Sequence, residues 1–222
     1  MKQDTKQLIA EFLKIQHGYQ FTRRASLTKE RFRDVADASE IIAFEESNQA
    51  VREPLIEHVG HLPIIASFFY EHTAHTKDID LGRVLTILSI HDIGETELGD
   101  INTYDKTEAD EAEELEVARK LLSPTLIPYF EEYEALETVD AKYAKFVDAM
   151  SPVFHKLDMP YINQKRFHAK GRSTADIINK KRPHMEWDSF LLELFDMCLD
   201  QLQRAEKGEK LLFPTMEYDI KN

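Results

Sequence analysis

A histidine and an aspartate stand side by side at the end of an apolar run. Residues 85–90 are Leu-Thr-Ile-Leu-Ser-Ile, and His91-Asp92 follow directly. Such a run carries the chain into the interior, where a carboxylate is costly unless a cation or hydrogen-bond donors satisfy it. A bound divalent metal ion is the simplest explanation for that placement. The other ligands of such an ion must come from elsewhere in the chain.

Two further stretches offer ligands of the same kind. His58 lies near the start of an apolar stripe with helical spacing, and Asp148 interrupts the otherwise apolar helix FVDAMSPVF. With His91 and Asp92 they give two imidazoles and two carboxylates from three helices. This mixed set suits Mn, Co, Fe, Ni or Zn better than calcium, which takes oxygen ligands, and Mg is kept as a further candidate. Such an ion would lower the pKa of a bound water and neutralise charge on a phosphoryl group.

The elements that would position these residues are predicted to be helices. Apolar side chains recur every three or four residues at about 4–16, 28–45, 54–70, 79–98, 107–122, 124–136, 139–157 and 187–206. Residues 158–186 are mixed in character, and we expect them to be irregular. No segment shows the sustained alternation of a β-strand. The sequence therefore predicts an all-α bundle of about eight to ten helices.

The length and composition are those of a globular protein. Of the 222 residues, 42% are hydrophobic and 31% are charged, which are ordinary fractions. The length is most simply one domain over residues 1–222. Within it we expect a metal-site core at about 40–157, a C-terminal helical extension at 158–207 and a loose tail at 208–222.

Charge and targeting signals restrict the partners and the compartment. The net charge of −13 argues against binding to a nucleic-acid duplex or an anionic membrane surface, because both favour a basic face. The single cysteine, Cys198, rules out an internal disulfide and fits a reducing compartment. No signal-peptide core is present, and no stretch reaches the roughly eighteen apolar residues of a membrane span. We therefore expect a cytoplasmic protein without a membrane partner.

The order of the candidate ligands is similar to that of a known family. His58, then His91-Asp92, then Asp148 give the pattern H…HD…D, which in an all-α chain resembles the HD-domain metal-dependent phosphohydrolases. HDIGETELGD is similar to the HD-x-x-E-x-x-x-GD pattern of the branch that contains the 5′-deoxynucleotidases. The segment EEYEALETVDAKYAKFVDAM resembles that branch's segment ending in K-x-x-D. The resemblance spans about 40–157 and implies an HD-type helical bundle.

The resemblance implies a role for each residue that matches the pattern. The metal ligands would be His58, His91, Asp92 and Asp148. Glu95 would be the acid/base or water-orienting carboxylate, and Asp100 would contact the sugar. His61 lies on the same helical face as His58, one turn away, and is the alternative ligand. The spacings of Phe44, Asn48 and Glu53, which match an aromatic residue, an Asn and a Glu of the branch, favour His58.

The chain departs from the branch at the residues expected to hold the phosphate. Phe44 stands where the branch has Trp, and Ala43 precedes it where the branch has Arg. In that branch these positions help to bind phosphate and exclude a 2′-hydroxyl. We therefore expect phosphate anchoring from Arg52 or a lysine, and the choice between ribose and deoxyribose stays open. Lys142 and Lys145 are expected to be mainly solvated.

The resemblance implies an enzyme with one divalent ion. The expected activity is hydrolysis of nucleoside 5′-monophosphates, ribo or 2′-deoxy, to nucleoside and phosphate, and a homodimer is the family expectation. One alternative is an HD-type hydrolase of another small phosphate ester. The other is a metal-stabilised ligand-binding protein without turnover. The candidate carboxylate Glu95 argues against the latter, because a purely structural ion has no need of it.

Overall fold

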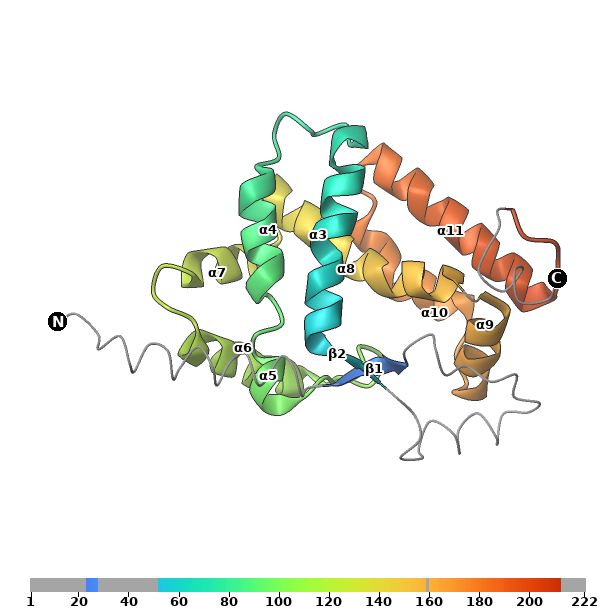
Figure 1. Cartoon of the computed structure of the whole chain (residues 1–222), viewed down its shortest axis with the longest axis horizontal. Coiled ribbons are helices and arrows are strands. Elements are labelled where there is room, and N and C mark those ends of the chain that lie inside the picture. Colours follow the sequence, from blue (N-terminus) through green and yellow to red (C-terminus); the bar gives the residue numbers. More distant parts are fainter. Residues whose placement is uncertain (1–22, 28–51, 159, 213–222) are drawn as a thin grey trace.

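The computed structural model describes residues 23–27, 52–158 and 160–212 (Figure 1). The helices expected at about 4–16 and 28–45, and Phe44 with them, lie outside this part of the chain. In chain order the elements are β1 (Arg23–Leu27), β2 (Arg52–Pro54), α3 (Leu55–Phe69), the 3-10 helix η2 (Tyr70–His72), α4 (Leu81–Ile90), α5 (Glu95–Leu98), α6 (Glu108–Leu121), α7 (Ile127–Ala135), α8 (Val139–Asp158), α9 (Pro160–Ala169), α10 (Thr174–Lys181), the 3-10 helix η3 (Arg182–His184) and α11 (Ser189–Lys207). The all-α prediction is confirmed.

Two local expectations were wrong. The segment 158–186 is helical, because α9 and α10 cover most of it. Its pattern was hard to recognise since α9 buries the polar side chains of Asn163 and Gln164, which obscures the apolar periodicity. The pair β1 and β2, antiparallel with Arg23 opposite Pro54, was also missed, because strands this short carry no measurable alternation.

Helix α8 is the centre of the bundle. It contacts α3, α4, α7, α9 and α11, and Figure 1 shows it passing behind α3 and α4. The largest side chains of its inner face, those of Tyr143, Phe146 and Met150, are fully buried. Helix α3 is tied to α8 where the hydroxyl of Tyr143 donates to the carbonyl oxygen of Ala66 at 2.6 Å. Residues on α3, α4 and α8 can therefore meet at one place.

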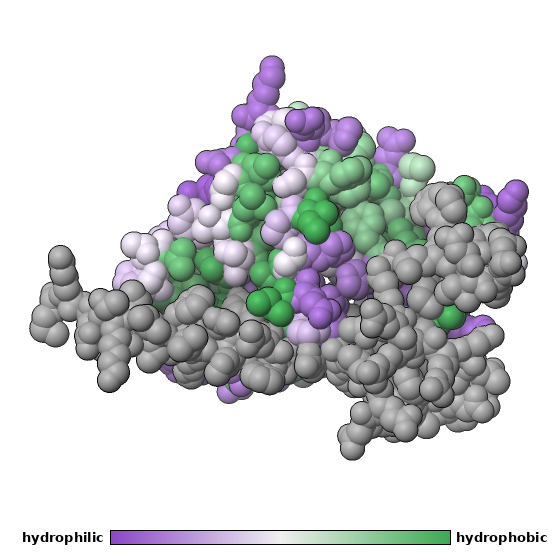
Figure 2. Space-filling view, viewed as in Figure 1, coloured by the Kyte–Doolittle hydropathy of each residue, from purple (hydrophilic) through white to green (hydrophobic). Residues whose placement is uncertain are grey.

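Helix α3 is apolar on two faces. Its inner face buries Leu55, His58, Leu62, Ile65 and Ala66. Its outer face exposes Ile56, Ile64 and Phe68, and Figure 2 shows the hydrophobic residues of that region on the surface. Periodicity alone therefore predicts the helix but does not decide which face is buried.

The expected helix at 79–98 is divided in two. Asp80 caps α4 by accepting a hydrogen bond from the backbone N–H of Arg83, and α4 ends just before His91. A turn through Gly94 then starts α5. A Cβ at Gly94 would lie 2.6 Å from the backbone oxygen of Glu114, so glycine is what allows α5 and α6 to pack this closely.

No helix in the described ranges is long and apolar enough to cross a membrane. That residues 1–222 form a single domain remains a prediction.

Candidate metal centre

Side chains from α3, α8 and the end of α4 converge on one point. The Nε2 atom of His58 lies 3.4 Å from Oδ2 of Asp92 and 3.5 Å from Oδ1 of Asp148. The Nε2 atom of His91 lies 3.1 Å from Oδ1 of Asp92 and 3.6 Å from Oδ1 of Asp148. Donors about 2.1 Å from a common ion and at right angles to one another are about 3.0 Å apart. Each imidazole nitrogen therefore lies within a few tenths of an ångström of this spacing from one oxygen of each carboxylate.

The protonation of His91 supports a cation at this point. Its Nδ1 lies 3.0 Å from the carbonyl oxygen of Leu88, and since a carbonyl cannot donate, the proton is on Nδ1. In the neutral imidazole Nε2 then presents a lone pair. Among the described residues this buried atom has no hydrogen-bond partner, and its neighbours are the oxygens of Asp92 and Asp148. A lone pair facing two carboxylates is unfavourable unless a cation lies between them. His58, His91 and Asp92 could hold a metal ion.

The two oxygens of Asp148 have different environments. Oδ2 accepts hydrogen bonds from the Tyr133 hydroxyl at 2.9 Å and from the Lys145 ammonium at 3.1 Å. Lys145 also donates to the Tyr133 hydroxyl at 3.0 Å. Oδ1 is the oxygen that faces the two imidazoles. Tyr133 and Lys145 thus hold the carboxylate so that one oxygen remains directed at the cluster, as outer groups do around metal ligands.

The charge states of these groups follow from their neighbours. Burial alone would raise the pKa of Asp148, but Lys145, His58 and His91 hold it well below its usual range. Burial lowers the pKa of His91, but Asp92 and Asp148 outweigh burial and raise it. Burial, reinforced by Asp148 and Asp92, raises the pKa of the Tyr133 hydroxyl well above 10. Tyr133 is therefore a neutral donor, and Asp148 is an anion at neutral pH.

Of the two candidate histidines on α3, His58 belongs to this cluster and His61 points elsewhere. The Nδ1 atom of His61 lies 3.3 Å from the Ser151 hydroxyl, and its ring is tilted against that of His155, with centroids 5.1 Å apart. The same Ser151 oxygen lies 3.4 Å from Nδ1 of His58. Ser151 therefore contacts the ring of His58 on the side away from the carboxylates.

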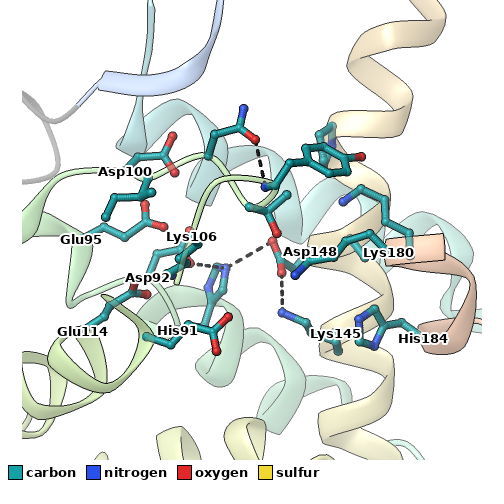
Figure 3. A pocket seen from close by; sticks show the side chains of 18 of the residues that line it. His91, Asp92, Glu95, Asp100, Lys106, Glu114, Lys145, Asp148, Lys180 and His184 are labelled. Atoms are coloured by element: carbon teal, nitrogen blue, oxygen red, sulfur yellow. Dashed lines mark hydrogen bonds and ion pairs between the residues drawn. The ribbon is translucent and has the colours of Figure 1, made fainter. Parts of the chain in front are cut away.

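A cavity of about 430 Å³ opens beside the cluster, and the other expected site residues Glu95 and Asp100 line it (Figure 3). Glu95 is 5% exposed and begins α5, one turn after Asp92. Asp100 follows Gly99, whose φ of 85° favours glycine. The cavity brings the two carboxylates near the cluster, as the motif spacing led us to expect. Arg52 lies in β2, and its side chain is not among those that the structure describes.

Several residues of the cavity were missed by sequence reasoning. Lys145 was expected to be solvated, yet it bonds Asp148, and its position three residues before Asp148 was the available signal. Lys106 also lines the cavity and pairs with Glu114. Lys180 and His184 reach the cavity from a segment that we expected to be irregular, so nothing in the sequence pointed to them.

The fold and the cluster together define an HD-domain protein. The sequence profile of the HD domain matches residues 44–186, more than half of the chain, and the chain belongs to this family. The metal-binding donor set and the family match support a metal-dependent phosphohydrolase as the general class.

Two solved structures are similar to this chain. One is the crystal structure of a protein from Magnetospirillum magnetotacticum MS-1, described as a predicted metal-dependent phosphohydrolase. It is 23% identical with a TM-score of 0.67, over 89% of this chain and 94% of the other. The second is a conserved hypothetical protein from Pyrococcus furiosus, 18% identical with a TM-score of 0.56, over 86% and 98%. At these identities the likeness shows the fold alone. No curated protein matched.

Proposed function

We propose that this protein is a metal-dependent phosphohydrolase that cleaves a small phosphate monoester, in the first instance a nucleoside 5′-monophosphate. The observation that carries the proposal is the position of the buried His91 Nε2, which lies 3.1 Å from Oδ1 of Asp92 and 3.6 Å from Oδ1 of Asp148. The family match and the description of the Magnetospirillum relative support the same class. The proposed ligands are His58, His91, Asp92 and Asp148.

A divalent ion bound there would polarise a phosphoryl oxygen and lower the pKa of a water molecule. Glu95 is the proposed acid/base group, because it is a buried carboxylate on the cavity wall and can accept a proton from the attacking water. Lys145 holds a positive charge next to Asp148 and can stabilise charge that develops on the phosphoryl oxygens. Hydrolysis would release the alcohol and phosphate.

Asp100 is the proposed contact of the sugar. It lines the same cavity as Glu95, and a carboxylate accepts hydrogen bonds from hydroxyls. A cavity of about 430 Å³ lies within the range of sites for small molecules. Substrate binding by Phe44, phosphate anchoring by Arg52 or a lysine, a homodimer and a cytoplasmic location remain proposals from the sequence.

The test is phosphate release from the eight common ribo- and deoxyribonucleoside 5′-monophosphates with Mn, Co, Zn or Mg. We expect Glu95→Gln to lower turnover by about a hundredfold or more while bound metal, measured by elemental analysis, stays at the wild-type level. Asp148→Asn should lose both metal and activity. Full turnover in Asp148→Asn would contradict the ligand assignment, and a metal-loaded wild type that hydrolyses none of these esters would contradict the substrate.

A further inference from the structure

The cavity beside the cluster has an acidic side and a basic side. Figure 3 shows Glu95, Asp100 and Glu114 on one side of the cluster, and Lys145, Lys180 and His184 on the other. We call the latter side the basic wall and define it by the cavity-lining residues Lys145, Lys180, Lys181 and His184. A ligand that fills the cavity meets carboxylates at one end, where Lys106 is paired with Glu114, and the lysines and imidazole of the basic wall at the other.

Three elements supply the basic wall. Lys145 comes from α8, whereas Lys180 and Lys181 end α10 and His184 lies in η3. Helix α8 contacts η3, which brings the two parts together. Lysines in the last turn of a helix are favoured by its dipole, so α10 can present two of them in one place. The wall beyond Lys145 is therefore built by the C-terminal part of the chain.

Two lysines of the basic wall act on its imidazole. The pKa of His184 is lowered to about 4, first by burial and then by the charges of Lys145 and Lys181. Lys156, which lines the same cavity, has a pKa lowered to about 8, again by burial first and then by the neighbouring cations Arg166 and Lys170. Lys145 and Lys181 therefore lie close enough to act on one imidazole, with Asp148 offsetting part of their charge.

The metal centre and Lys145 can serve one phosphoryl group. Lys145 lies 3.1 Å from Asp148, next to the proposed ion. Lys180 and His184 lie beyond it in Figure 3, on a different element, and a single phosphoryl group at the ion does not account for them. Lys180 is exposed, so an anion can reach it without displacing the core.

We infer that the basic wall binds a second anionic group of the substrate, so that the preferred esters carry another phosphate besides the phosphoryl group held at the metal centre. This inference rests on the proposed function and deepens it, because it names the class of ester. Nucleoside diphosphates and nucleosides phosphorylated at two positions belong to this class. Loss of one hydrogen bond between charged groups at an exposed lysine weakens binding by about tenfold.

The experiment is calorimetric titration of the Mn-loaded protein, freed of excess metal, with inorganic pyrophosphate and with orthophosphate. We expect pyrophosphate to bind at least tenfold more tightly. Lys180→Gln should weaken pyrophosphate about tenfold and leave orthophosphate within about twofold. Lys180→Arg should restore pyrophosphate binding. Lys77→Gln is the matched control, because Lys77 is exposed and lies outside the cavity, and it should bind both anions like the wild type.

Two results would overturn the inference. One is equal affinity of the wild type for the two anions. The other is a Lys180→Gln protein that keeps its affinity for pyrophosphate, or whose affinity for both anions falls equally. An equal fall would place Lys180 at the phosphoryl group of the metal centre. Because the measurement is binding, it is separate from hydrolysis. A protein that hydrolyses monophosphates but shows either result keeps the proposed function and refutes the basic wall.

Discussion

Removal of one hydroxyl tests whether Asp148 is a metal ligand positioned by its neighbours. Tyr133→Phe deletes the donor that lies 2.9 Å from Oδ2 of Asp148 and leaves the ring in place. Lys145 still donates to the same oxygen at 3.1 Å, so the carboxylate remains charged but is less firmly held. Loss of a hydrogen bond to a charged group costs about 1.5–3 kcal/mol, and the remaining donor favours the lower value.

We therefore expect the Mn affinity of Tyr133→Phe to fall about tenfold, within the range found for groups that orient metal ligands. The assay is competition with a metal indicator at neutral pH, with thermal unfolding of the metal-free protein measured in parallel. Turnover at saturating Mn should change much less than affinity, because the bond acts on the ligand and not on the reacting atoms.

Tyr143→Phe is the matched control. Tyr143 is also buried, and its hydroxyl donates to the carbonyl oxygen of Ala66, which also accepts the backbone N–H of Tyr70. Its removal should cost about 1 kcal/mol of stability without changing Mn affinity. If Tyr133→Phe binds Mn within twofold of the wild type, or if Tyr143→Phe loses as much affinity, then Tyr133 does not position a metal ligand.

Three further predictions concern stability. Burial keeps His184 neutral in the folded state with a pKa of about 4, against about 6.5 when unfolded. Unfolding therefore takes up a proton between these pH values, and the free energy of unfolding should fall as the pH drops through this window. In thermal melts from pH 7 to 4, His184→Gln should lack this part of the loss, and a pH profile like that of the wild type would contradict the assignment. Gly94→Ala should lose about 1–3 kcal/mol of unfolding free energy in urea melts, because the new Cβ would lie 2.6 Å from the backbone oxygen of Glu114. Gly60→Ala has nothing within 4 Å of its Cβ and should gain about 0.5–1 kcal/mol. Equal effects of the two substitutions would refute the steric argument. Mn at a hundredfold excess over its Kd should add about 2.7 kcal/mol to the unfolding free energy, and a chelator should abolish this gain. A melting temperature that responds neither to Mn nor to the chelator would argue against a bound ion.

Sequence reasoning reached the fold and the main cluster because both have local signals. The apolar run before His91-Asp92 indicates burial, and a buried carboxylate demands a partner. His58 and His61 could not be separated locally, since they share a face of α3 and that helix is apolar on two sides. The choice depends on where α8 places Ser151 and Asp148, which is tertiary information.

The basic wall could not be predicted for a related reason. A lysine in a mixed, polar segment is usually exposed to solvent. No spacing rule connects Lys180 or His184 to the His91-Asp92 pair, about ninety positions earlier in the chain. Lys145 did carry a signal, because three residues separate it from Asp148 on one helix, yet the same spacing describes an ordinary surface pair. Only the packing of η3 against α8 turns these residues toward one cavity.

The convergence of the four donors also constrains how the fold can vary. Asp92 follows His91 in the chain, so these two move together, but His58 and Asp148 join them only through the contacts that α3 and α4 make with α8. If the two imidazoles and two carboxylates, now 3.1–3.6 Å apart, hold one ion as proposed, its ligand distances tolerate shifts of only a few tenths of an ångström. A bound ion would therefore stabilise the packing of all three helices at once.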